Sequence, residues 1–213
     1  MKFELFNSDG TSSGEKAIDN FPTFDGDKGV DALRQSIIAV HANKRQGNAS
    51  TKLRSEVAGS GKKLYRQKGL GVGRAGDKKA IQRRGGGVIF GPRPRSYNQK
   101  LNKKIKRLAL GRALFEQAES SSICLISDWT IEKPKTHLFN SLLKKITPNS
   151  KKILVVADTF SNDVSLAARN LSFARISTSD NLAAIDIVQA DKIIFSESGL
   201  DSLISKYNKE KVA

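Results

Sequence analysis

Cysteine and histidine are almost absent from this chain of 213 residues, which contains one Cys and two His. A single cysteine excludes an intramolecular disulfide and a cysteine-based zinc site, and two distant histidines give no metal-ligand spacing and no local Cys–His pair. Cys124 lies in an apolar run, where we expect a small buried hydrophobic residue rather than a reactive thiol. The sequence therefore predicts no metal site and no cofactor.

Long hydrophobic runs are missing as well. No window approaches the roughly 18 consecutive apolar residues that a membrane-spanning helix needs. The N-terminal residues MKFELFNSDG have neither the apolar region of a secretory signal nor the Arg-rich, acid-poor composition of a transit peptide. We therefore expect a cytoplasmic protein that does not enter a membrane.

Acidic residues are scarce in one long segment, where the basic residues are concentrated. Between Lys44 and Arg107, 20 Lys and Arg stand against two acids, Glu56 and Asp77, which gives a net charge of +18. The whole chain carries +16, so the remaining residues sum to −2. A pI near 10.0 with the positive charge clustered in this way favours nucleic acid as the partner over an acidic protein or a membrane.

The same segment also lacks the spacing of a helix or a strand. Glycine recurs from Gly47 to Gly91, and no apolar alternation appears before Val88–Phe90. So polar a stretch cannot bury enough apolar surface to offset its ordering entropy, and unstructured loops beyond about 12–15 residues are usually functional or disordered. We interpret residues 44–95 as an extended loop inserted into a single α/β domain formed by residues 1–43 and 96–213. A solvated linker is the alternative, but a linker has no need of this charge.

The rest of the chain has the patterns of a folded domain. Alternation over residues 2–7 predicts a short strand, and the polar stretch after it shows no pattern that we assign to a helix or strand. Val30, Leu33, Ile37 and Val40 share one face of a predicted helix that begins near residues 27–29. A second helix is predicted at Gln99–Ser120, after the basic segment.

From residue 123 onward, short apolar strands alternate with amphipathic helices. We predict strands at residues 123–127, 153–157, 173–176 and 193–195, and helices at residues 137–146, 163–171, 182–190 and 199–207. Near-continuous apolar strands that alternate with helices are typical of a parallel sheet covered on both faces. The predicted fold class is α/β, with a mostly parallel sheet flanked by helices and one long basic loop inserted.

Candidate catalytic features are weak. Gly71–Gly76 matches G-x-G-x-x-G, but this fingerprint works only between a strand and a helix, and basic polar residues surround it here. Asp158, Asp180, Asp186 and Asp191 lie near predicted strand ends and helix starts, where we expect them to cap helices. We therefore expect no catalytic residues and no enzyme. A nucleotide-dependent enzyme built on the parallel sheet is an alternative hypothesis.

The basic segment is well suited to RNA. Arginine presents a planar fork to phosphate oxygens and a flat face to unpaired bases, and glycine lets the backbone approach closely. Aromatic side chains such as Tyr65 and Phe90 are able to stack on bases. We predict that RNA is bound by Lys44, Arg45, Lys52, Arg54, Lys62, Lys63, Tyr65, Arg66, Lys68, Arg74, Lys78, Lys79, Arg83, Arg84, Arg93, Arg95, Lys100, Lys103, Lys104 and Arg107. The last four would form a basic stripe along the second predicted helix.

Several motifs in this segment resemble a known family. They are KLRSEVAGSGKK at residues 52–63, RQKGLG at residues 66–71, and GGVIFGPRP at residues 86–94. Looser matches follow at residues 133–136 and 167–171. Together they resemble the ribosomal protein L4 family of the large subunit, over roughly residues 30–205.

The resemblance implies a structural, non-catalytic protein that binds large-subunit rRNA early in assembly. It implies a compact domain on the outside of the subunit, contacts with neighbouring ribosomal proteins, and a loop that threads through rRNA. The tip of the loop would line the exit tunnel and meet the nascent polypeptide. By position, the tip corresponds to Gln67, Lys68, Gly69, Leu70, Gly71, Val72, Gly73 and Arg74.

The sequence also departs from this family at a few positions. Family members usually have Pro and Trp at the positions of Leu64 and Tyr65, and Thr at the position of Leu70. Val72 stands where an arginine is common, so the tip has one charge fewer. A regulator outside the ribosome that binds mRNA through the same loop is the remaining alternative hypothesis.

Overall fold

The computed structural model describes residues 1–131, 133–148 and 150–212. The chain divides into two compact units. One unit joins Met1–Val40 to Lys100–Ala213, and the other consists of His41–Gln99. The first unit contains the sheet and the core, and the second contains most of the basic segment.

The first unit is built on a six-stranded sheet with the order β2-β1-β3-β6-β4-β5. Its strands are β1 (Lys2–Phe6), β2 (Ser12–Ala17), β3 (Ile123–Ile126), β4 (Ile153–Ala157), β5 (Ala174–Thr178) and β6 (Lys192–Ser196). β2 pairs with β1 in antiparallel fashion, whereas every other neighbouring pair is parallel. The expected mostly parallel α/β fold is therefore confirmed.

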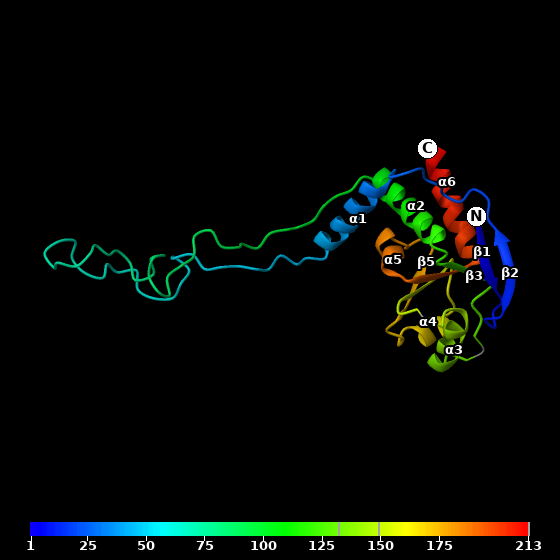
Figure 1. Ribbon diagram of the computed structural model, residues 1–213. Helices are drawn as coiled ribbons and strands as arrows, with labels where there is room; N and C mark the ends of the chain where they lie inside the picture. The colour runs from blue at the N-terminus through cyan, green and yellow to red at the C-terminus, as the bar shows by residue number, and fades with distance from the viewer. Residues whose placement is uncertain (132, 149, 213) are drawn as a thin grey trace. The chain divides into compact units, whose positions relative to one another are not determined.

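Helices cover both faces of this sheet and make three layers (Figure 1). The helices are α1 (Val30–Asn43), α2 (Lys103–Glu119), α3 (Thr136–Ile146), α4 (Asn162–Ala168), α5 (Ala184–Gln189) and α6 (Glu197–Val212). Buried residues of α1, α2, α5 and α6 share one hydrophobic cluster, and those of α3 and α4 share the other. The strands separate the two clusters.

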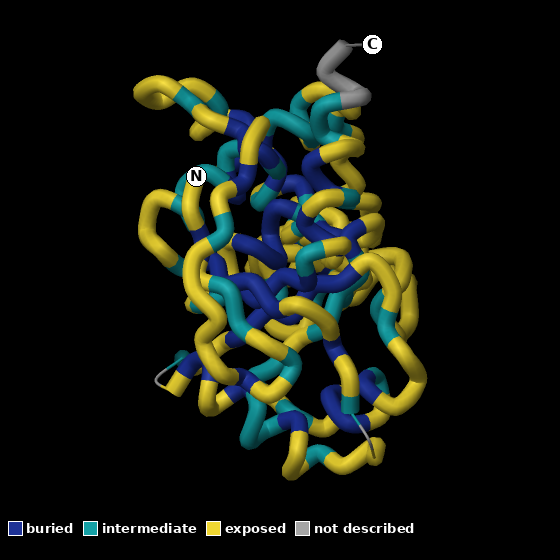
Figure 2. Tube along the Cα trace, turned by 90° about the vertical axis from the view of Figure 1, so that its right-hand side faces the viewer, coloured by how far each residue is buried: buried dark blue, intermediate teal, exposed yellow. Residues whose placement is uncertain are grey.

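Alternating side chains of the central strands supply both clusters. Leu154 and Val156 of β4 belong to the first cluster, whereas Ile153 and Val155 belong to the second. All five residues of β4 are buried, because a strand covered on both faces presents no side to water. Figure 2 shows this buried centre surrounded by exposed segments. Cys124 is part of the second cluster, and burial raises the pKa of its thiol.

No pattern in the sequence indicated β2. This strand, SSGEKA, has no buried residue and lies at the edge of the sheet, so it shows no apolar alternation. A tight turn brings it back onto β1, where the Asn7 and Gly10 amides donate hydrogen bonds within the turn at 2.9 Å. A polar, charged edge strand is a common protection against edge-to-edge aggregation.

The predicted start of the second helix is wrong by about one turn. α2 begins at Lys103, not at Gln99, because Asn102 has extended dihedral angles and occupies the N-cap position. The Asn102 side chain makes no capping hydrogen bond, so the extended backbone alone marks the start of the helix. Lys100 therefore lies outside the helix, and only Lys103, Lys104 and Arg107 of the predicted stripe belong to α2. At the start of α4 the N-cap residue is Ser161, whose hydroxyl accepts a hydrogen bond from the Val164 amide.

Candidate nucleic-acid interface

The unit His41–Gln99 is a long irregular hairpin. Its two arms run side by side and are joined by scattered backbone hydrogen bonds (Figure 1). The Arg95 amide donates to Gly47 at 3.2 Å, and the Thr51 amide donates to Pro92 at 3.0 Å. Farther along, the Leu64 amide donates to the Gly76 carbonyl at 3.1 Å. All residues of this unit are described, and between the end of α1 and Gln99 they form only one isolated β-bridge.

The base of the hairpin is closed by a side-chain clamp. The Asn43 amide group donates to the Gln99 carbonyl at 3.3 Å, and its oxygen accepts from the Gln99 amide at 2.7 Å. Gly47 lies just inside this clamp with a φ of 71°, in the left-handed region that favours glycine. A Cβ at Gly47 would fall 2.0 Å from the Arg95 carbonyl oxygen. This position therefore requires glycine on two counts.

Two arginines converge on one aromatic ring near the same end. The Arg45 guanidinium carbon lies 3.8 Å from the Tyr97 ring centroid, and that of Arg95 lies 4.6 Å from it. A hydrogen bond from Arg95 lowers the pKa of the Tyr97 hydroxyl. Cation–π contacts hold both guanidinium groups in place, although their like charges repel. The arrangement presents two ordered positive charges to an anion.

Farther along the hairpin, one of its two acids is tied to the opposite arm. Arg93 Nη2 lies 3.0 and 2.9 Å from the carboxylate oxygens of Glu56, which also accepts a hydrogen bond from the Leu53 amide. The Arg93 hydrogen bond is the main reason that the pKa of Glu56 is lowered. The other acid, Asp77, accepts a hydrogen bond from the Lys79 amide at 3.0 Å. Both acids are thus engaged in contacts within the hairpin, and most of its Lys and Arg side chains remain exposed.

Close approach of the two arms explains a second glycine. A Cβ at Gly87 would lie 2.2 Å from the Arg54 amide nitrogen, a backbone atom of the opposite arm. The Val88 amide next to it donates to the Lys52 carbonyl at 2.9 Å. Two residues farther on, Phe90 is 98% exposed. The glycine thus lets the arms meet, and the aromatic ring is left without cover.

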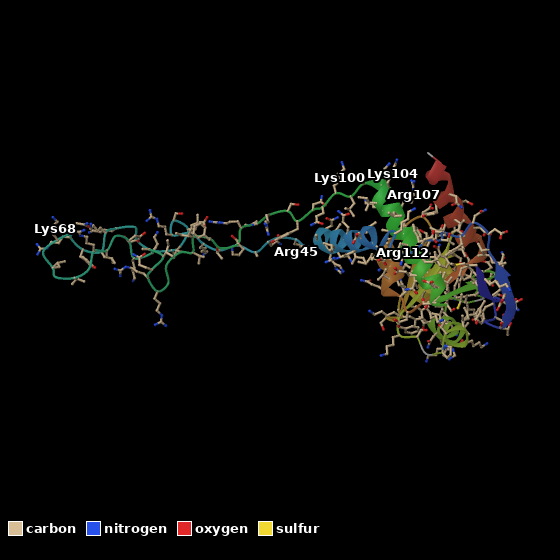
Figure 3. All side chains as sticks on the ribbon, turned by 45° about the horizontal axis from the view of Figure 1, so that its top comes forward. Arg45, Lys68, Lys100, Lys104, Arg107 and Arg112 are labelled. Carbon is tan, nitrogen blue, oxygen red and sulfur yellow. The ribbon has the colours of Figure 1, made fainter. Side chains whose placement is uncertain are left out.

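The far end of the hairpin is ordered by its own polar side chains. The Tyr65 hydroxyl donates to the Gly73 carbonyl, and Arg66 Nη2 donates to the Gly69 carbonyl at 3.0 Å. These bonds close the turn from both sides and leave its apolar residues outside. Leu70 is 48% exposed and Val72 is 65% exposed. Figure 3 shows Lys68 at this end of the hairpin and Arg45 at the other.

The predicted RNA-binding residues are nearly all at the surface. Four of the twenty, Tyr65, Lys79, Arg83 and Arg107, are half-buried, and the others are exposed. Sixteen of them lie in the hairpin unit, whereas Lys100, Lys103, Lys104 and Arg107 lie in the other unit. The sequence did not predict that Arg45 and Arg95 would both lie over the Tyr97 ring, because the spacing of these three residues forms no recognisable motif.

Arg112 of α2 has a structural role that the sequence left unexplained. It occupies an otherwise apolar helical stripe, and its side chain is only 11% exposed. The guanidinium donates to the Gly26 carbonyl at 2.6 Å and to Glu116 at 2.8 Å. Arg112 therefore fixes the irregular connection before α1 against α2.

The carboxylates near the sheet take structural roles. Asp158 accepts a hydrogen bond from the Ser179 hydroxyl, and Asp191 accepts from the amides of residues 151 and 152. Asp186 pairs with Arg175 at 2.7 Å and accepts from the Ala183 amide. Asp180 pairs with a lysine of α6. The expected helix-capping role is therefore confirmed for Asp186 of α5 and wrong for the other three carboxylates.

The G-x-G-x-x-G match at Gly71–Gly76 lies in the hairpin turn, with no strand before it and no helix after it. It therefore lacks the context that a dinucleotide site requires. Within the described ranges, no cluster of three or more His, Cys, Asp or Glu side chains is placed to hold a metal ion. None of the helices in the described part of the chain has the length and hydropathy that crossing a membrane would require.

The fold and the hairpin together define an α/β protein that carries one long, basic, glycine-rich insertion. The model of the ribosomal protein L4/L1 family matches this chain over residues 21–206. The large ribosomal subunit protein uL4 of Chlorobaculum parvum is 36% identical over 203 residues, covering 95% of this chain and 98% of that protein. The proteins of the same name from Parabacteroides distasonis and Amoebophilus asiaticus are 38% and 34% identical over 200 and 208 residues. These alignments cover 94% and 98% of this chain, and 96% and 99% of those proteins.

The chain belongs to the ribosomal protein L4/L1 family. The resemblance carried by the basic motifs is thereby confirmed. Membership in a family of ribosomal proteins also confirms the expectation that the chain is not an enzyme.

Proposed function

We propose that this protein is a structural component of the large ribosomal subunit in the cytoplasm and that it binds large-subunit rRNA. Family membership carries the first part of the proposal, since the relatives are named as large-subunit proteins. The hairpin carries the second part. It concentrates fifteen Lys and Arg against two acids in 59 residues, and both acids are engaged in contacts within the hairpin.

Each region of the hairpin fits contact with RNA in its own way. The ordered guanidinium groups of Arg45 and Arg95 suit a phosphate, because planar donors bind phosphate oxygens strongly. The bare ring of Phe90 suits an unpaired base. Backbone hydrogen bonds hold the two arms close together. A narrow hairpin of this kind suits a path between packed RNA helices.

We further propose that residues 67–74 at the end of the hairpin line the nascent-peptide tunnel. The exposed apolar side chains of Leu70 and Val72 support this, since a wall that polypeptides pass needs no dense positive charge. We also propose that the protein binds early in subunit assembly. A hairpin of this length is threaded through rRNA most easily before the RNA has closed around it.

Sedimentation of the tagged full-length protein from a cell lysate tests the function. We expect stoichiometric migration with the large subunit, and retention at salt concentrations that strip surface-bound basic proteins. Migration at the top of the gradient would contradict the proposal and favour a regulator outside the ribosome.

A deletion within the hairpin tests its role. Removal of residues 60–76 should leave the thermal unfolding transition of the α/β unit in place, because Ala75 is the only buried hydrophobic residue of that stretch. The same deletion should release the protein from the subunit at high salt. Loss of the thermal transition would show that the stretch contributes to the core.

A further inference from the structure

A cavity of about 760 Å³ lies in the unit that contains the sheet. It is lined by the irregular connection of residues 20–28, by the N-terminal half of α2 and by the end of α6. The predicted RNA contacts include only Lys104 and Arg107 of its lining. Lys28, Phe24 and Tyr207 are lining residues to which nothing above assigns a function.

The lining is positively charged. It includes Lys28, Lys104 and Arg107, and none of the described residues that line it is an acid. Lys28 and Lys104 are exposed, whereas Arg107 is half-buried and reaches the neighbourhood of Tyr207. Figure 3 shows Lys104 and Arg107 on α2. A recess lined by several cations, with no acid among its described lining residues, favours a bound anion, and a phosphate group in particular.

Two aromatic rings stand beside these cations, and packing holds both of them. Phe24 meets Phe115 of α2 edge to face, with 5.9 Å between the ring centroids. The end of the Tyr207 ring lies against Gly111, where a Cβ would fall 2.6 Å from the hydroxyl oxygen. Partial burial raises the pKa of Tyr207, whose protonated hydroxyl is a hydrogen-bond donor. Both rings are half-buried and therefore partly open to a ligand.

The wall formed by residues 20–28 is fixed to both helices. Arg112 donates hydrogen bonds to the carbonyls of Gly26 at 2.6 Å and Lys28 at 3.4 Å. At the other end of the wall, the Asn208 side chain of α6 donates to the Asn20 carbonyl at 3.4 Å. A recess whose irregular wall is held in this way loses little entropy when a ligand enters.

We propose that this cavity holds one unpaired nucleotide of an RNA strand, with its base against Phe24 or Tyr207 and its phosphate beside Lys28, Lys104 and Arg107. The volume lies within the range of about 300–1,000 Å³ that is typical of ligand pockets. A stacked base in a duplex cannot enter, whereas an unpaired base is free to leave the helix and stack on an aromatic side chain. The proposal rests on the RNA-binding function proposed above and assigns a separate contact outside the hairpin.

Binding of the full-length protein to a large-subunit rRNA transcript tests the proposal. Lys28→Gln should weaken binding about three- to ten-fold and reduce the slope of log affinity against log salt by close to one phosphate contact. Phe24→Leu should weaken binding about ten-fold without changing that slope, because stacking involves no net charge. Lys144→Gln is the matched control, since Lys144 is exposed on α3 against the opposite face of the sheet.

The controls separate this proposal from the proposed function. If the wild type binds the transcript and a Lys68→Gln hairpin variant binds less tightly, while Lys28→Gln and Phe24→Leu bind as the wild type does, the cavity proposal is overturned and the function stands. If the wild type itself does not bind, both fail. Lys28→Gln alters only an exposed side chain, so the test survives even if Phe24→Leu unfolds.

A free nucleotide would make the same contacts as a nucleotide of an RNA strand. Calorimetry with adenosine and uridine monophosphates distinguishes these two ligands. We expect only millimolar binding of these monophosphates, because one nucleotide lacks the neighbouring contacts of a strand. Micromolar binding that is lost in Lys28→Gln would make a free nucleotide the occupant and overturn the assignment to RNA.

Discussion

Replacement of Gly47 by alanine tests whether the base of the hairpin must have its observed path when RNA is bound. The φ of 71° costs a residue with a Cβ about 1–2 kcal/mol. The new Cβ would also fall 2.0 Å from the Arg95 carbonyl oxygen, so the arms must separate there. The hydrogen bond from the Arg95 amide to the Gly47 carbonyl would then be lost, at a further cost of about 0.5–1.5 kcal/mol.

These two costs add to about 1.5–3.5 kcal/mol, which corresponds to about a 10- to 300-fold loss of affinity. Ala75 is the only buried hydrophobic side chain in His41–Gln99, all of whose residues are described. The free variant therefore relaxes at little cost, and the penalty falls on binding. The α/β unit should melt at the wild-type temperature, because its core lies elsewhere.

The assay is filter binding or calorimetry with a large-subunit rRNA transcript at one fixed salt concentration. Gly61→Ala is the matched control, since Gly61 has no positive φ and a Cβ there would meet no atom within 4 Å. A Gly47→Ala affinity within two-fold of the control would refute the reasoning. It would mean that RNA binds the hairpin with a different path at its base.

Three further results are expected. Arg112→Met should lower the free energy of unfolding in urea by about 1.5–3 kcal/mol, since hydrogen bonds from a charged group to Gly26 and Glu116 are lost; an unchanged urea midpoint would contradict this. The carboxyl of Glu56 should titrate by NMR below the ordinary range, because its pKa is lowered in the folded chain. Its ion pair with Arg93 is therefore fully formed above the pKa of an unfolded Glu and is lost as the pH falls through the lowered value. Arg93→Gln should move the midpoint toward the ordinary range, because the largest of the causes that lower the pKa is removed, and a wild-type midpoint already in that range would argue against the ion pair. Charge reversal of Lys104 and Arg107 to Glu should weaken RNA binding more than ten-fold in about 0.1–0.2 M salt without loss of helical circular dichroism, and equal affinity would exclude this part of α2 from the contact.

Apolar patterns predicted most of the fold. The run Ile153–Ala157 is a strand in both prediction and structure, because a strand buried on both faces has only apolar side chains to show. β2 was missed for the opposite reason, since its exposed side chains leave no pattern. The start of α2 was placed too early because the apolar and basic spacing continues through Leu101 and Lys100, whereas the backbone of Asn102 sets the boundary.

For the candidate site, the sequence predicted where the positive charge is concentrated, but it did not predict how the charged side chains are arranged in space. Composition alone indicated which segment carries the excess of Lys and Arg. The placement of Arg45 and Arg95 on the Tyr97 ring depends on pairing between two arms that are far apart in sequence. The cavity that includes Lys28 and Tyr207 depends on segments even farther apart, and no local spacing marks such a meeting.

The clamp between Asn43 and Gln99 has a consequence for how this protein changes over evolutionary time. The Asn43–Gln99 clamp holds the two ends of the hairpin together. The entropic free-energy cost of closing the loop between them then increases by only about 0.6 kcal/mol for each doubling of its length. One residue added to each arm lengthens a hairpin by about 3.3 Å. Insertions and deletions in pairs can therefore tune the reach of the hairpin to a changing RNA, while the α/β unit keeps the same sequence and stability.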